Sequence, residues 1–182
     1  MLVAVSVGAC GGVGVDRQPV QIDAHGVPFG LLAPSAATTT APPAPTAAVT
    51  VYFVSSTGLR AVSRALSDIG PVDGALEALS SGPTVGEVDE GLTSPVSAAA
   101  PLRAEPMREG VVPVDVSASF QNLGGVAQIA AVAQLVFSLT GTPGVSGVVL
   151  LVGGRPTRVP TAGGGLASGA LTRADYASFA PA

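Results

Sequence analysis

From residue 49 onward, runs of β-branched and aliphatic residues alternate with stretches that repeat apolar residues at helical spacing. Strands are predicted at 49–55, 110–117, 145–152 and 155–159. The first run is apolar on both faces, which predicts a strand in the interior of a sheet. Gly153 and Gly154 separate the last two runs, and because paired glycines readily adopt positive φ angles, these runs predict a β-hairpin with a tight turn.

The main helix is predicted over residues 121–139. Ile129, Val132, Val136 and Leu139 form its apolar stripe, which Val126, Leu135 and Phe137 widen. The positions that remain polar are Gln121, Asn122, Gln128, Gln134 and Ser138. So wide an apolar surface predicts a helix buried against the sheet, and its three glutamines argue against a membrane span.

Shorter helices are predicted on either side of the main helix. The segment 71–82 places Val72, Ala75, Leu76 and Leu79 on one stripe. We expect Asp73 to cap its start, and Gly82 with Pro83 to end it. The spacing of Thr84 and Glu87 matches a capping box, so a further helical turn should follow and end near Gly91. Near the C-terminus, the glycine-rich residues 161–169 predict a loop, and Thr172 should cap a short helix.

Residues 59–66 fit two interpretations. Leu59, Val62 and Leu66 keep helical spacing, whereas an edge strand would turn Leu59, Ala61 and Ala65 inward and the two arginines of the segment outward. With either outcome, alternating strands and helices predict an α/β (α+β) fold. We expect one two-layer domain over residues 49–180, in which a small mixed sheet is packed by one long helix and one or two short ones.

The first ten residues resemble a truncated lipoprotein signal. Val7, Gly8 and Ala9 precede Cys10 as in a bacterial lipobox, where small residues flank the scissile bond and the thiol receives the lipid. No basic residue precedes Cys10, although a signal peptide has a positive first region. The alternative is an apolar strand that buries the free thiol.

Residues 11–48 are predicted to be an extended, disordered tail. Residues 35–48 contain only Ala, Thr, Pro and Ser, a composition that buries too little apolar surface to fold and favours extended geometry. The glycines that follow Cys10 are interpreted as a spacer, because no strand precedes them as a nucleotide-binding loop requires. The tail would hold the domain away from a membrane surface.

Charge and composition exclude several function classes. The net charge is −4 and all eight basic residues are arginines, so the clustered cations that bind nucleic acid are missing. The chain contains one cysteine and one histidine, His25, which excludes an internal disulfide and a structural zinc cluster. No cofactor and no metal ion are predicted.

Candidate catalytic groups are carboxylates, because His25 lies in the tail and leaves the domain without a histidine base. The candidates are Glu77, Glu87, Asp89, Glu90 and Asp115. Helix capping or exposure on a solvated face explains each of them, and the acidic spacing at 87–90 matches no calcium loop. We therefore expect that the protein is not an enzyme. The alternative is a wall-glycan hydrolase or glycan-binding lipoprotein with two carboxylates in a cleft.

The ordered segments resemble a GerMN domain, the module named after spore germination proteins and also found in actinobacterial envelope lipoproteins. The likeness rests on VYFV at 51–54, GL at 58–59, Arg64, ALEALSSGPT at 75–84, Glu87, GLTS at 91–94, VPVDVS at 112–117, AQLVFSLT at 133–140 and VSGVVLLVGG at 145–154, with VPFGLL at 27–32 resembling the lipoprotein subgroup. In the family a proline follows an aliphatic residue, whereas in Ser94-Pro95-Val96 the aliphatic residue follows the proline. The conformation of the loop that comes next is therefore not predicted.

The resemblance implies a role at the cell envelope in sporulation, germination or wall-linked signalling, with no catalytic residues to carry over. Together with the lipobox it predicts a lipid-anchored protein on the extracytoplasmic face of the cell membrane. Its expected partners are the membrane itself, through the anchor, and envelope proteins or peptidoglycan. A role as an accessory to a membrane sensor kinase is a further option, for which a longer chain would be expected.

Overall fold

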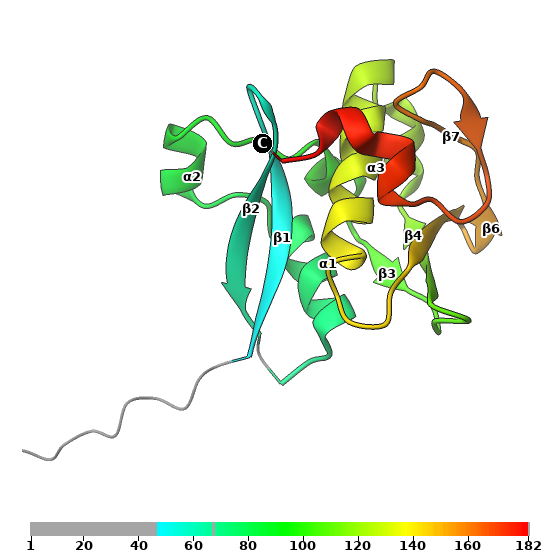
Figure 1. Cartoon of the computed structure of the whole chain (residues 1–182), viewed down its shortest axis with the longest axis horizontal. Coiled ribbons are helices and arrows are strands. Elements are labelled where there is room, and N and C mark those ends of the chain that lie inside the picture. The colour runs from blue at the N-terminus through cyan, green and yellow to red at the C-terminus, as the bar shows by residue number, and fades with distance from the viewer. Residues whose placement is uncertain (1–46, 67, 182) are drawn as a thin grey trace, which may run out of the picture. The chain divides into compact units, whose positions relative to one another are not determined.

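The structure is a computed structural model that describes residues 47–66 and 68–181. The predicted signal at 1–10, with Cys10 and its lipobox, and nearly all of the predicted tail lie outside the described residues. The described part is a small mixed α/β domain, as the sequence predicts (Figure 1).

Strands β1 (Ala48–Ser55) and β2 (Gly58–Ala65) form an antiparallel hairpin with a two-residue turn. Gly58 has a φ of +131°, which an L side chain rarely adopts, and the hydroxyl of Ser55 donates to its carbonyl oxygen at 2.9 Å. The turn returns the chain along β1, so residues 59–66 pair with 47–54 as a strand and not as a helix.

The face of β2 that packs inward differs from that of the edge-strand interpretation, of whose three inward residues only Leu59 is buried. Val62 stands opposite Val51 and packs against the core, while Ala61 and Ala65 are exposed. In this register Arg60 and Arg64 share the face of Val62, because side chains alternate along a strand. Both arginines thus lie on the packed face of the hairpin, whereas the edge-strand interpretation placed them outward.

A four-stranded sheet has the strand order β3-β4-β5-β6. Its strands are β3 (Arg103–Ala104), β4 (Val111–Val116), β5 (Gly147–Val152) and β6 (Arg155–Pro156). β4 and β5 are parallel and the other pairs are antiparallel, so the sheet is mixed. Gly153 and Gly154 turn β5 into β6 with φ angles of 58° and 74°, which confirms the predicted hairpin, although its second strand ends at Pro156.

Helix α3 (Gly125–Leu139) connects β4 to β5 and contacts β1, β5 and β7 (Figure 1). Every residue from Ala130 to Leu139 is buried, as expected of a central helix. The predicted start at residue 121 is wrong, because Ala118–Asn122 form a separate 3-10 helix, η4, and Gly124 is the N-cap of α3. Val126 consequently lies in the first turn and is 79% exposed, outside the buried stripe to which the sequence assigned it.

Helix α1 (Pro71–Ser81) follows the predicted stripe and ends at Gly82, where φ is +74°. Its N-cap is Gly70, followed by Pro71, and Asp73 lies in the first turn without making a capping bond. Asp73 therefore does not cap the helix as predicted. Its charge still lies near the positive end of the helix dipole.

Helix α2 (Val85–Asp89) begins with the predicted capping box. The backbone N–H of Thr84 donates to the Glu87 carboxylate at 2.8 Å, and the N–H of Glu87 donates to the Thr84 hydroxyl at 3.4 Å. The chain then leaves α2 through Gly91, as predicted, and continues into the 3-10 helix η3 (Pro95–Ala99). No residue of α2 is buried.

The C-terminal segment adds a small ribbon and a helix. β7 (Val159–Pro160) pairs with β8 (Leu166–Ala167), so part of the predicted glycine-rich loop is a strand. The 3-10 helix η5 (Arg173–Phe179) begins at Thr172, whose N–H and hydroxyl both donate to Asp175. Tyr176 is fully buried, which raises the pKa of its hydroxyl above its usual range, and that hydroxyl donates to the Pro160 carbonyl at 2.9 Å.

The apolar core joins the hairpin, α1 and α3 with β4 and β5. Its largest fully buried apolar side chains are Tyr176, Phe53, Phe120, Leu79, Leu92, Leu135, Leu139, Leu150 and Leu171. Within the described residues, every helix is too short or too polar to cross a bilayer.

Candidate functional site

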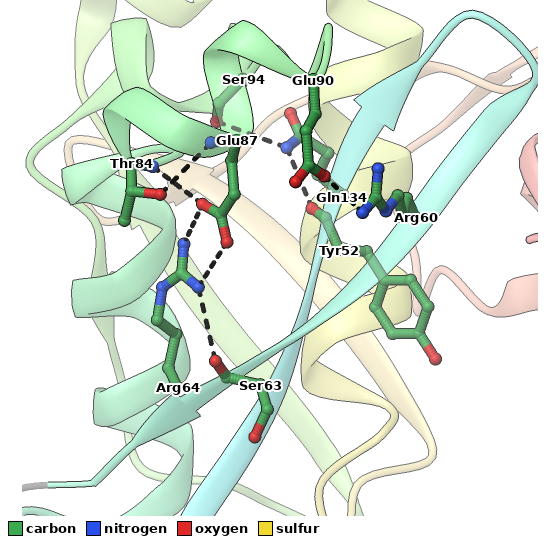
Figure 2. Close-up of polar contacts among 9 residues, drawn as sticks. All are labelled: Tyr52, Arg60, Ser63, Arg64, Thr84, Glu87, Glu90, Ser94 and Gln134. Carbon is green, nitrogen blue, oxygen red and sulfur yellow. Dashed lines mark hydrogen bonds and ion pairs between the residues drawn. The ribbon is translucent and has the colours of Figure 1, made fainter.

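Helix α2 is attached to β2 by two ion pairs (Figure 2). The Arg64 guanidinium donates to both carboxylate oxygens of Glu87, at 2.8 and 2.5 Å, and Arg60 donates to Glu90 at 2.5 Å. The first pair is largely shielded from solvent, with side chains 22% and 17% exposed, whereas both side chains of the second are more than half exposed. Because α2 buries no residue, its attachment to β2 rests on these two ion pairs and not on apolar packing.

The carboxylate of Glu87 accepts hydrogen bonds from two partners, the Arg64 guanidinium and the Thr84 backbone N–H. The hydrogen bond from Arg64 is the largest cause that lowers the pKa of Glu87, from 4.5 to about 2, against the opposing effect of burial. Arg64 also lies over the ring of Phe53, 5.4 Å from its centroid. Glu87 is thus a charged anchor for α2 and not an acid that would donate a proton near neutral pH.

The outer edge of β1 is covered by α3 and by residues that follow α2. The N–H of Tyr52 donates to the Ser138 hydroxyl at 2.9 Å, and the carbonyl of Tyr52 accepts from the Gln134 amide at 3.0 Å. Val54 exchanges two backbone bonds of 2.9 Å with Thr93. β1 is therefore not the interior strand that the sequence predicts, and side chains replace the missing neighbour strand.

Arg173 joins η5 to the C-terminal end of α3. Its side chain donates to the Phe137 carbonyl at 2.9 Å and to the Thr140 hydroxyl at 2.8 Å. The guanidinium also lies 5.1 Å from the ring centroid of Phe137 and 5.8 Å from that of Tyr52. A cation at this end of a helix complements its dipole and its unpaired carbonyls.

The outer edge of β2 is open within residues 47–66 and 68–181. Backbone groups alternate in direction along a strand, and those of Tyr52 and Val54 point away from β2. Their opposite residues, Ala61 and Leu59, therefore point their own N–H and C=O groups away from β1. Ser63 and Ala65 continue the series, and Ser63 O meets only the side chain of Arg64, at 3.4 Å.

The candidate carboxylates are not brought together. Glu87 and Glu90 are ion-paired, and Asp115 accepts the backbone N–H of Gly154 at 2.9 Å. Glu77 on α1 and Asp89 on α2 are exposed. No group of three or more metal-ligating side chains occurs in the described part of the chain. The cap at Glu87 is confirmed, whereas Asp89 and Glu90 lie at the end of α2, where a cap at the helix start does not account for them.

Sequence reasoning missed the buried polar pair on α3. Helical spacing leaves Gln134 and Ser138 as polar positions beside the apolar stripe, yet both are fully buried and bond to β1. Their spacing of four residues puts them on one face, and this was the available signal. What the chain alone does not provide is the position of β1, more than 80 residues away.

Comparisons with known proteins agree with this fold. The first GerMN domain of the sporulation protein GerM from Bacillus subtilis matches with a TM-score of 0.57 and 22% identity, over 71% of this chain and 99% of that one. The tandem GerMN domains of the same protein match with a TM-score of 0.48 and 19% identity, over 59% of this chain. This chain spans 39% of the tandem structure. No curated protein gives a significant match.

A family model also matches, over residues 50–158, which is more than half of the chain. The model is Germane, described as sporulation and spore germination. The matched residues include the hairpin, α1, α2, α3 and the four-stranded sheet described above. The chain therefore belongs to the Germane family of sporulation and spore germination domains.

Proposed function

We propose that this domain is a non-catalytic binding module that meets envelope proteins or wall polymer outside the cell membrane. The observation that carries the proposal is the contrast between the two edges of the hairpin. α3 and Thr93 cover the edge of β1, while the edge of β2 from Ala61 to Ala65 stays open within the described residues. An open strand edge invites pairing with another molecule, and folds that avoid such pairing normally cover it.

A second surface supports a binding role. Val54, Thr93, Pro95, Val126 and Ala130 line an open hollow that is mostly apolar. Val126 projects from the first turn of α3 and is 79% exposed. Exposed apolar surface of this kind marks interaction sites on soluble domains when it is contiguous.

The wall-glycan hydrolase alternative needs two carboxylates facing one substrate. Glu87 and Glu90 at α2 are each engaged in an ion pair with β2, and Asp115 on β4 is bonded to Gly154. No observation in the described residues favours this alternative over binding.

We also propose that acylated Cys10 holds the chain at the extracytoplasmic face, with residues 11–48 as a tether. The lipobox sequence and the Pro-rich tail support this part of the proposal. A single acyl chain binds membranes weakly, so the diacylglycerol of a lipobox cysteine is the chemistry that would retain the protein.

Photo-crosslinking of the full-length protein in native membranes tests both parts. A photoreactive amino acid replaces exposed Val88 on α2, and a matched variant carries it at exposed Leu166 on β8. We expect an envelope protein or a peptidoglycan fragment to crosslink at position 88 more strongly than at 166, and Cys10→Ala to release the protein from the membrane fraction. Equal labelling at both positions would contradict a specific surface, and an unmodified N-terminus on cytosolic protein would contradict the anchor.

A further inference from the structure

We propose that the open edge of β2 receives an extended segment of a partner protein, rich in basic side chains, as an added β-strand. This inference rests on the proposed function and narrows it from envelope partners in general to a polypeptide bound through its backbone. Strand addition of this kind uses main-chain hydrogen bonds for affinity and side chains for specificity.

The backbone groups at the outer edge of β2 form a regular array. Leu59, Ala61, Ser63 and Ala65 point their N–H and C=O groups outward, two residues apart. An extended polypeptide offers acceptors and donors at the same spacing of roughly 6.6 Å. A glycan has hydroxyl groups but no such alternating array. The edge therefore fits a protein strand better than wall polymer.

The length and the side chains of β2 also suit the addition of a strand. β2 is eight residues long, and the side chains at the outward-facing positions 61, 63 and 65 are small and exposed. Natural edges are usually protected by prolines, by inward-pointing charges or by a bulge. β2 contains no proline, and both of its arginines are in ion pairs with α2. The inward-pointing arginines are thus neutralised, and no proline interrupts the outward-facing backbone groups.

The charges beside β2 indicate the chemistry of the partner. Both arginines of β2 are neutralised by Glu87 and Glu90. At the end of β2, Glu77 of α1 lies near Ala65 and is exposed, and the described residues show no ion pair for it. The uncompensated charge at this end of the edge is thus negative, which favours a partner with lysine or arginine side chains.

A hollow at the end of β2 completes the surface. Ala65, Leu66, Ile69, Gly74 and Glu77 are among the residues that line it, and Ile69 is 40% exposed. Apolar side chains thus lie beside a free carboxylate. A strand added at this edge would place an aliphatic side chain against Ile69 and a basic one near Glu77.

The test uses the full chain, labelled with nitrogen-15, and synthetic hexapeptides with blocked ends that alternate lysine and valine. We expect the amide signals of Leu59, Ala61, Ser63 and Ala65 to shift and their hydrogen exchange to slow on binding. A peptide with glutamate in place of lysine controls for charge. A peptide with N-methyl groups on alternate residues controls for backbone pairing, and both should bind at least about tenfold more weakly.

Ser63→Pro is the decisive variant, because it removes an N–H that the β1–β2 pairing does not use. Proline is tolerated at such outward positions of an edge strand. We expect the fold to persist and peptide affinity to fall about tenfold, while the matched Ser63→Thr keeps its affinity. Glu77→Gln should weaken binding only at low salt, by a few fold.

Three outcomes would overturn the proposal: no binding of the lysine peptide, undiminished binding of the N-methylated peptide, or shifts confined to residues away from β2. The last outcome, with crosslinking at Val88 retained, would remove the strand-addition mode and leave the binding function standing. Loss of the membrane crosslinks with peptide binding retained would contradict the proposed binding function at the envelope and leave strand addition at β2 standing.

Discussion

At the residue scale, Arg64 determines how α2 is attached to the domain. It forms two bonds to Glu87 and lies over Phe53, so its guanidinium contacts α2 and the core at once. Arg60 makes the corresponding contact with Glu90 where both side chains are well exposed. Exposed ion pairs contribute about 0–1 kcal/mol, whereas shielded hydrogen bonds to a charged group contribute about 1.5–3 kcal/mol.

We therefore predict that Arg64→Met lowers the free energy of unfolding by about 1–3 kcal/mol at neutral pH, and that the matched Arg60→Met lowers it by less than about 1 kcal/mol. Urea unfolding followed by circular dichroism measures both. Equal losses in the two variants would show that shielding does not distinguish the pairs.

The same pair sets a pH dependence. The folded pKa of Glu87 is lowered from 4.5 to about 2, so its stabilisation is complete above 4.5 and is lost as the pH falls through about 2. In Arg64→Met this pKa rises toward its ordinary value. The gap in unfolding free energy between the two proteins should therefore close as the pH falls through that window, and a constant gap would mean that packing on Phe53, not charge, is lost.

At the scale of elements, the two strands of one hairpin have opposite surroundings. Helix α3 contributes Gln134 and Ser138 to the edge of β1, and Thr93 completes the cover. Gln134 also donates to the Ser94 hydroxyl at 3.3 Å and accepts from the Val96 N–H at 3.4 Å, so one amide joins three segments. A buried backbone group without a partner is costly, and this explains polar residues inside an otherwise apolar helix.

We predict that Gln134→Leu lowers the free energy of unfolding by about 1–3 kcal/mol, because it leaves the part-buried carbonyl of Tyr52 without its donor. Gln121→Leu, at an exposed position of η4, is the matched control and should change it by less than about 0.5 kcal/mol. Thermal or chemical denaturation distinguishes them, and a neutral Gln134→Leu would show that the edge does not need its amide.

At the scale of the whole molecule, the sequence predicts a tether ahead of the domain that the structure describes. The composition of residues 11–48 predicts no core, whereas the domain from β1 to η5 has one continuous apolar cluster. A tether and a binding domain have different physical requirements: the tether needs reach and the domain needs a fixed surface.

Limited proteolysis of the full chain with a protease of broad specificity tests this division. We predict rapid cleavage between residues 11 and 48 and a resistant fragment that begins near residue 49 and extends to about 180. Mass spectrometry of the fragments gives the boundaries. Cleavage within α3 or β5 at the same rate would contradict a compact domain, and an intact tail would contradict the predicted tether.

The sequence by itself determined the elements whose signals are local. The turn at Gly153-Gly154, the capping box of Thr84 and Glu87, the end of α1 at Gly82 and the burial of the second half of α3 all follow from spacing within a few residues. The same holds for the family, because the order of these segments along the chain carries the likeness.

The tertiary structure decided whatever depends on which segments meet. Residues 59–66 have both helical and strand periodicity, and only pairing with β1 selects the strand and its inward face. The partner of Glu87 is 23 residues away, and the partners of Tyr52 are more than 80 residues away. Local spacing contains no information on such distances, so the covered edge of β1 and the open edge of β2 become visible only when the chain is folded.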